Sequence, residues 1–202
     1  MHVAVVGGGS RAAEWITRYL ASGLDVVVDD VATVREQVEA LWPASDRLGL
    51  FPGSSIARMR TAAASDLATA RLVHVIDGDV PGSTAALIAT DHTARGCSPV
   101  HLVPLVEVDG PDAAALTDFC RSIGMAPMPA DSPEIERWRM GEGLVRLTGG
   151  DPDALLAVMR GLRPSGVGAG AAIAHHEAVR FASGGVTRWQ PGEIPAAPLV
   201  LY

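Results

Sequence analysis

Cysteine is scarce in this 202-residue chain, which has only Cys97 and Cys120. Two cysteines are too few for a disulfide framework, and their spacing is not that of metal ligands. We expect both to be small buried hydrophobic residues. The pair His175-His176 does not indicate a metal site, because adjacent side chains on a helix point about 100° apart. We predict no metal, and we assign these histidines to an interface or a polar pocket wall.

Clusters of positive charge and long hydrophobic runs are also missing. The 16 basic residues are spread along the chain, with arginine dominating, and the net charge is -7 with a pI near 5.3. This balance argues against a nucleic-acid partner. No apolar run approaches the roughly 18 residues of a membrane span, and the start MHVAVV carries no basic leader. We expect a cytoplasmic protein, and the abundance of Ala, Gly and Val is typical of a bacterial gene.

Aromatic residues make up only 4% of the chain, against 48% hydrophobic and 19% charged residues, with a mean hydropathy of +0.23. This composition is typical of a globular chain rather than a disordered one. At 202 residues the chain suits one compact domain, or one domain with a small appendage. The four tryptophans are expected to anchor a core or an interface, not to stack on bases.

The stretch VAVVGGGSRAAEWITRYLASGLDVVVDD predicts a strand, a glycine-rich turn, a helix and a second strand with an acidic end. This order is typical of a dinucleotide-binding βαβ unit. One glycine permits the tight turn, another lets the backbone approach a pyrophosphate at the helix N-terminus, and a small third residue lets helix and strand pack closely. The predicted cofactor-binding residues are Gly7, Gly8, Gly9, Ser10, Ala12 and Asp30.

Asp30 indicates which nicotinamide cofactor would bind. At the end of the second strand, its carboxylate is placed to accept hydrogen bonds from the ribose hydroxyls of NAD, and its charge would repel the extra phosphate of NADP. The predicted cofactor is therefore NAD. The alternative is a Rossmann-type scaffold whose site stays empty.

Hydrophobic periodicity and turn residues predict the remaining elements. Trp42-Pro43 is expected to end the second helix, and Pro104 marks a bend or an edge in the strongly β-forming segment VHLVPLVEV. The run STAALIATDHTAR is helical in composition. The predicted helices span 31–41, 83–95, 112–124, 153–162 and 169–181, and the predicted strands span 56–62, 72–76 and 100–108.

Several stretches resemble the 3-hydroxyacyl-CoA dehydrogenase superfamily, and above all its carnitine dehydrogenase and lambda-crystallin branch. They are the N-terminal unit, VEALWPASDRLGL, SPVHLVPLVEV and RSIGMAPM, with AVRFASGGVTRW as a weaker match. The resemblance implies an α/β fold, a Rossmann-like, doubly wound and mostly parallel sheet from which one βα unit is missing, followed by a short helical appendage. It divides the chain into a dinucleotide-binding domain, 1–130, and a truncated helical region, 131–202.

The resemblance also implies catalytic positions. Glu107 matches the family glutamate that orients the catalytic histidine, and Ser83 with Thr84 matches a Ser/Asn-Thr motif near the substrate hydroxyl. Alignment on SPV puts Arg95 where the family has its histidine. A His–Glu pair suits alcohol oxidation, because imidazole accepts the hydroxyl proton and the carboxylate holds its tautomer.

Three histidines are candidates to replace the missing one. His92 is the best placed in the sequence, on the helix expected before the strand, although a solvated helix histidine is the competing interpretation. His101 lies within the segment predicted as a strand, so its face stays open, and His74 lies in the fourth strand. The predicted catalytic residues are therefore Glu107, Ser83 and His92.

Two classes of function follow from these observations. The first is an NAD(H)-linked oxidoreductase that acts on a small hydroxy or keto substrate with a relocated proton donor, which Gly7, Gly9 and Asp30 favour. The second is a family member without the redox step, such as a lyase, cyclase, isomerase or binding subunit, which Arg95 and the missing unit favour. A homodimer is a further hypothesis, because truncated helices with exposed apolar faces would seek a partner.

Overall fold

The computed structural model describes residues 2–63, 65–79, 87–162 and 169–185. Contacts within the chain divide it into two units, 1–129 and 130–202, and each is described by itself. None of the described helices is long and apolar enough to cross a membrane.

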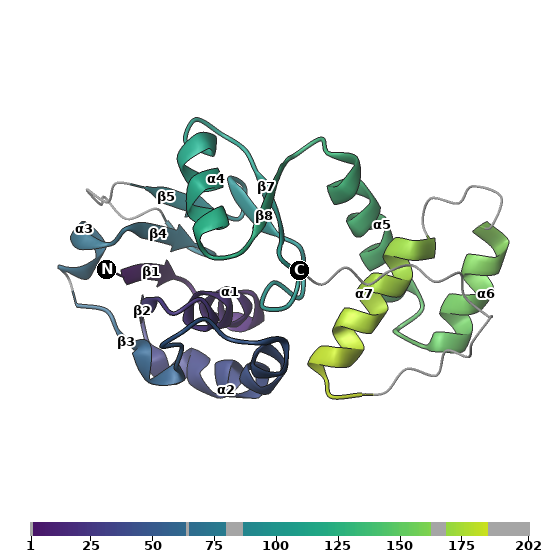
Figure 1. Ribbon diagram of the computed structural model, residues 1–202, viewed down its shortest axis with the longest axis horizontal. Helices are drawn as coiled ribbons and strands as arrows, with labels where there is room; N and C mark the ends of the chain where they lie inside the picture. The colour runs from purple at the N-terminus through teal and green to yellow at the C-terminus, as the bar shows by residue number, and fades with distance from the viewer. Residues whose placement is uncertain (1, 64, 80–86, 163–168, 186–202) are drawn as a thin grey trace. The chain divides into compact units, whose positions relative to one another are not determined.

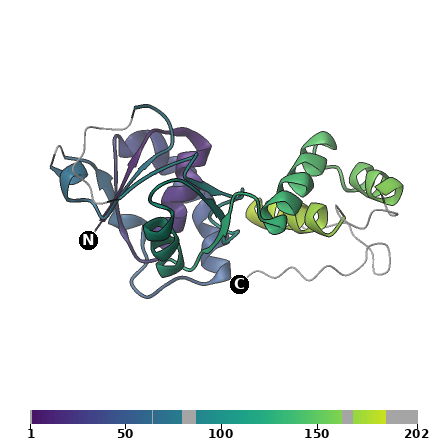
Figure 2. The ribbon, with the colours of Figure 1, turned by 90° about the horizontal axis from the view of Figure 1, so that it is seen from above.

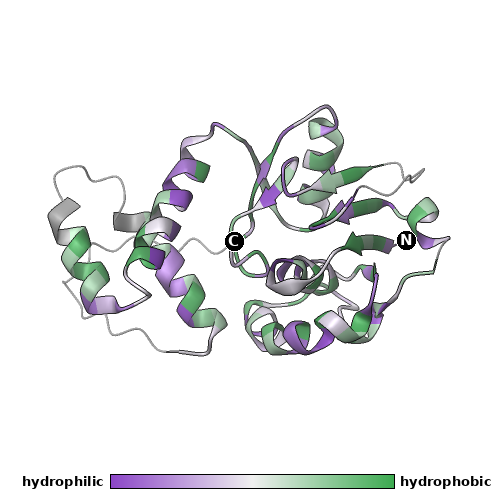
Figure 3. Ribbon diagram, turned by 180° about the vertical axis from the view of Figure 1, so that it is seen from behind, coloured by the Kyte–Doolittle hydropathy of each residue, from purple (hydrophilic) through white to green (hydrophobic). Residues whose placement is uncertain are grey.

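The first unit is built on a five-stranded parallel sheet (Figure 1). Its strands lie in the order β3-β2-β1-β4-β5, the order of a doubly wound fold. Valine dominates the central strands, as expected for strands that are covered on both faces, and these strands are green in Figure 3. The strands are β1 (His2–Val6), β2 (Asp25–Val28), β3 (Met59–Thr61), β4 (Leu72–Val75) and β5 (Ile88–Thr90).

Helices cover the two faces of this sheet unequally. The larger hydrophobic cluster joins one face to α1 (Gly9–Ala21), α2 (Val31–Leu48) and α4 (Ala113–Ser122). A smaller cluster on the other face includes side chains beside the short α3 (Asp66–Thr69). The predicted Rossmann-like, doubly wound sheet is confirmed.

A second sheet of three strands follows, in the order β6-β7-β8. It contains β6 (Ala94–Gly96), β7 (Leu105–Val108) and β8 (Ala126–Pro129), with β6 antiparallel to β7 and β8 parallel to it. The helix predicted at 83–95 is therefore wrong for the described residues, which form β5, a turn and β6. Pairing with β4 and β7 overrides the helical composition of this run.

Three further predictions need correction. The second helix does not end at Pro43 but continues to Leu48, because packing of the buried Ala44 helps to offset the hydrogen bond that proline cannot donate. The strand predicted at 56–62 is a 3-10 turn, Ile56–Arg58, followed by β3. The strand predicted at 100–108 begins only at Leu105, and a turn precedes it.

The second unit contains α5 (Pro133–Leu147), α6 (Pro152–Leu162) and α7 (Ala169–Ala182). Helices α5 and α7 lie side by side (Figures 1 and 2). Their backbones approach so closely that a Cβ on Gly141 would lie 2.4 Å from the carbonyl of Ala171. His175 and His176 are both buried on α7, and His175 meets the edge of Trp138. These histidines line the interior of the helical unit.

Candidate functional site

The glycine turn lies where the strand order reverses, between β1 and β4. Doubly wound sheets bind ligands at the carboxyl ends of their strands at this switch point. Gly7 has a φ of +102° and packs against the chain that leaves β4. A Cβ at this position would lie 2.7 Å from the backbone nitrogen of Asp77. Only glycine fits here without displacing that backbone.

The two glycines that follow face open space. Gly8 caps α1 without a side-chain hydrogen bond, and nothing lies within 4 Å of a Cβ placed on Gly8 or Gly9. Gly9 has a φ of +77°, which again favours glycine. Ser10 is exposed beside it, whereas Ala12 is fully buried between helix and sheet. The turn thus presents an open, uncapped helix N-terminus of the kind that binds anions.

Two acids follow β2 at the same edge of the sheet. The Asp29 carboxylate accepts a hydrogen bond from the Gly7 N–H at 3.0 Å, while Asp30 caps α2 by accepting from the Ala32 N–H at 2.9 Å. Both side chains are exposed, and each carboxylate can accept further hydrogen bonds. The sequence predicted a role for Asp30 but not for Asp29. Two consecutive aspartates at the end of the strand are the signal that would have indicated both.

Glu107 lies directly across the ladder from Arg95. Gly96, the neighbour of Arg95, faces the core, since a Cβ there would lie 2.9 Å from Trp15 of α1. Arg95 therefore shares the opposite face with Glu107, because residues paired across strands lie on one face. Glu107 is buried and Arg95 is exposed. Arg95, which the alignment places where the family has its histidine, is thus adjacent to the predicted catalytic Glu107.

His92 lies in the turn between β5 and β6, not on a helix as predicted. Its side chain is exposed, and its backbone N–H donates to the Thr90 hydroxyl at 3.2 Å. His92 precedes Arg95, the partner of Glu107 in the ladder, by three residues, which is roughly 10 Å along an extended chain. The structure brings Arg95, rather than His92, opposite Glu107. Ser83 lies outside the described residues.

Two residues of α1 bind the segment that carries this turn. The Arg11 guanidinium donates to the Gly96 carbonyl at 2.6 Å and lies 3.5 Å from the Asp91 carboxylate. The Glu14 carboxylate accepts from the Ser98 hydroxyl at 3.1 Å and from the Val100 N–H at 2.9 Å. Sequence reasoning missed both residues, because their partners lie more than eighty positions away in the chain.

Comparison with known proteins bears on this site. No family model matches the chain. L-carnitine dehydrogenase of Burkholderia mallei is 32% identical over 170 residues, which cover 62% of this chain and 53% of that protein. L-carnitine dehydrogenase of Streptomyces coelicolor is 40% identical over 62 residues, 28% of this chain and 20% of that protein. The chain is thus similar to L-carnitine dehydrogenases, which agrees with the resemblance of its sequence to the carnitine dehydrogenase branch of the 3-hydroxyacyl-CoA dehydrogenase superfamily.

Solved structures of dehydrogenases share the fold. (S)-3-hydroxybutyryl-CoA dehydrogenase from Ralstonia eutropha superposes with a TM-score of 0.54 at 17% identity, covering 90% of this chain and 87% of that one. A 5-formyl-3-hydroxy-2-methylpyridine 4-carboxylic acid 5-dehydrogenase, described as an NAD+ dependent dismutase, gives 0.53 at 18% identity, covering 76% and 68%. Both are dehydrogenases by name, and at these identities they support the fold alone.

The chain spans about half the length of the L-carnitine dehydrogenases that it matches. The alignment with the Burkholderia mallei protein spans 170 residues, whereas it covers only 62% of the 202 residues of this chain. The aligned stretch is therefore longer in the relative than in this chain. A segment of the relative therefore has no counterpart here. This agrees with the missing βα unit, for which only residues 76–87 separate β4 from β5.

The other two histidine candidates are both buried. His74 is fully buried and its Nδ1 shares a 2.6 Å hydrogen bond with the Tyr19 hydroxyl, and burial lowers its pKa to about 3. His101 lies in the turn before β7, where burial lowers its pKa to about 4. Neither ring is exposed at the carboxyl edge of the sheet, so His92 is the accessible imidazole of the three.

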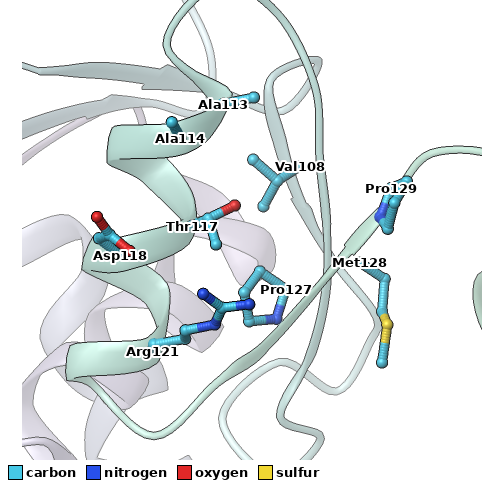
Figure 4. A pocket seen from close by; sticks show the side chains of 9 residues that line it. All are labelled: Val108, Ala113, Ala114, Thr117, Asp118, Arg121, Pro127, Met128 and Pro129. Atoms are coloured by element: carbon cyan, nitrogen blue, oxygen red, sulfur yellow. The ribbon is translucent and has the colours of Figure 1, made fainter.

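A hollow of the first unit lies apart from the glycine turn. It has a volume of about 520 Å³ and lies between α4 and the ends of β7 and β8 (Figure 4). Thr117 and Arg121 contribute polar groups, while Val108, Pro127 and Pro129 make most of its wall apolar. None of its lining residues belongs to the predicted site. The described residues contain no group of three metal-ligating side chains either.

Proposed function

We propose that this chain is an NAD(H)-linked oxidoreductase that acts on a small hydroxy or keto substrate. The observation that carries the proposal is the open glycine turn at the switch point, with two acids beside it. Gly9 leaves room where a phosphate would approach the uncapped start of α1. The L-carnitine dehydrogenases that the chain resembles are dehydrogenases by name, which points in the same direction.

The residues present fit this cofactor. The backbone N–H groups at Gly9 and Ser10 would bind the pyrophosphate, and Asp30 would accept hydrogen bonds from the ribose. Asp29 adds a second negative charge that would disfavour the phosphate of NADP. When bound, the nicotinamide supplies the hydride acceptor or donor.

In this proposal His92 exchanges the hydroxyl proton of the substrate, because it is an exposed imidazole at the carboxyl edge. Glu107 supplies a buried negative charge beneath that region, and Arg95 opposite it orients an anionic or carbonyl group of the substrate. Ser83 is proposed as a hydrogen-bond partner of the substrate oxygen. Substrate, proton acceptor and nicotinamide would then converge beside the start of α1.

Arg95 also favours the second candidate function, a family member without the redox step. A guanidinium stays protonated at working pH and cannot serve as a general base. If His92 does not replace the missing histidine, the same pocket would bind its ligand, or catalyse a lyase or isomerase reaction, without hydride transfer. The choice between the two functions rests on one measurement, cofactor binding.

The test is calorimetric titration of the chain with NADH, with NADPH as the control. We expect saturable binding of NADH and at least tenfold weaker binding of NADPH. Asp30→Asn should narrow this difference while preserving the helix cap, since asparagine caps as well as aspartate. Absence of NADH binding would sink the redox assignment and leave the second candidate.

Assembly is a separate proposal. On α5 the side chain of Leu147 is 77% exposed and that of Met140 is 39% exposed, so this helix presents apolar surface to solvent. We propose that a second copy covers it in a homodimer. Light scattering of the chain and of Leu147→Glu tests this, and a monomeric parent chain would overturn it.

A further inference from the structure

Helix α1 is tied through two side chains to a segment far along the chain, from Asp91 to Val100. Arg11 binds the backbone of this segment at Gly96 and lies beside the Asp91 carboxylate. Glu14 accepts hydrogen bonds from the Ser98 hydroxyl and the Val100 N–H. Nη1 of Arg11 and Oε2 of Glu14 also lie 3.8 Å apart, so the two side chains form one network. We call this network the α1 clasp.

The two ends of the clasp belong to different parts of the candidate site. Arg11 and Glu14 lie on the first two turns of the helix whose N-terminus carries the glycine turn. The Asp91–Val100 segment carries His92 and Arg95. The clasp therefore connects the turn proposed for the cofactor to the side chains proposed for the substrate, beside the hydrophobic cluster that contains Trp15 and Val100.

We propose that Arg11 and Glu14 are positioning residues that hold His92 and Arg95 in place relative to the glycine turn. This inference rests on the function proposed for the site. Neither residue touches the reacting atoms in it, and each acts through the segment that it binds.

The contacts differ from those of ordinary surface charges on a helix. Exposed pairs such as Arg35 and Glu39 on α2 join neighbouring turns of one helix and contribute little. Glu14 instead accepts from a backbone N–H and a hydroxyl of a distant loop, with only 16% of its side chain exposed. Hydrogen bonds to a charged group in such a setting are about twice as strong as neutral ones. The clasp can therefore determine where the segment lies.

Amide exchange followed by NMR tests the contact itself. Val100 donates its N–H to Glu14, so Glu14→Ala should raise the exchange rate at Val100 roughly tenfold or more. Glu14→Gln keeps one acceptor oxygen and should restore part of the protection. Glu39→Gln on α2 is the matched control and should leave Val100 unchanged. Equal exchange at Val100 in the parent chain and Glu14→Ala would overturn the proposal.

NADH titration tests the positioning role in the same samples. In the parent chain, NADH should shift the amide signals of residues 91–96 as it binds at the glycine turn. In Arg11→Met and Glu14→Ala, the NADH affinity should stay within about threefold while this response is lost. Arg35→Met is the matched control and should keep the response.

Amide exchange at Val100 and NADH titration distinguish failure of the proposed function from failure of the positioning role. If the parent chain does not bind NADH, the proposed function is wrong, and exchange at Val100 still decides whether the clasp exists. If both variants bind NADH and keep the full response at residues 91–96, the clasp is only structural and the positioning role is refuted.

Discussion

Substitution of the three consecutive glycines separates fold stability from cofactor binding. In Gly7→Ala the new Cβ would lie 2.7 Å from the backbone nitrogen of Asp77 and 2.9 Å from its carbonyl oxygen, at a φ of +102°. Backbone strain costs about 1–2 kcal/mol and overpacking about 1–3 kcal/mol more. We expect a loss of about 2–5 kcal/mol in the free energy of unfolding, which lowers Tm by roughly 10 °C.

The neighbouring glycines give the controls. Gly8→Ala meets nothing within 4 Å and has no positive φ, so its stability should change by less than about 0.5 kcal/mol. Gly9→Ala also meets nothing, yet its φ of +77° should cost about 1–2 kcal/mol, and its methyl group would enter the proposed phosphate site.

Thermal unfolding and NADH titration of the three variants complete the test. We expect Gly7→Ala to be the least stable and Gly9→Ala to lose NADH affinity by more than its stability change explains. If Gly7→Ala and Gly8→Ala have the same Tm, the close approach of Gly7 to Asp77 is refuted. If Gly9→Ala binds NADH as the parent does, the turn is not the phosphate site.

Three further predictions concern the histidines and Arg95. Burial lowers the pKa of His74 to about 3 and of His101 to about 4, so below pH 6.5 the unfolded chain binds protons that the folded chain does not. The free energy of unfolding should therefore fall with pH from about 6.5 downward, by about 1.4 kcal/mol per unit for each histidine, and urea titrations at pH 7.5 and 5 check this. Tyr19→Phe removes the only described partner of His74 Nδ1 and should cost about 1–3 kcal/mol in the same assay; an unchanged midpoint would contradict the buried bond. Arg95→His places an imidazole opposite Glu107 and should raise NAD-linked alcohol oxidation, followed as NADH absorbance; equal or lower rates would argue against Glu107 as the partner of a catalytic base.

The N-terminal unit could be predicted because its signals are local. Strand, turn and helix follow each other within Val3–Asp30, and the buried Ala12 lies where the motif requires a small residue. Both cysteines are buried, as expected from their number and spacing. Hydrophobic periodicity also placed Leu116, Phe119, Cys120 and Ile123 on one buried face of α4.

The substrate side of the site could not be predicted in the same way, because long-range pairing determines it. The residues of β5 and β6 form strands of only three residues each, too short for a period to appear in the sequence. Their strand character comes from neighbours that β4 and β7 supply. Glu14 likewise binds the turn before β7, and no local pattern in the sequence reveals its hydrogen bond to Val100.

Helix α1 connects the glycine turn to the segment that carries Arg95. Its first residue belongs to the glycine turn, which matches the dinucleotide-binding pattern closely, while Arg11 and Glu14 bind the segment in which Arg95 stands opposite Glu107. Apolar packing holds the same segment against α1 as well, since Trp15 of α1 and Val100 belong to one hydrophobic cluster. The clasp adds direction to this apolar packing, because the strength of a hydrogen bond depends on the angle between donor and acceptor.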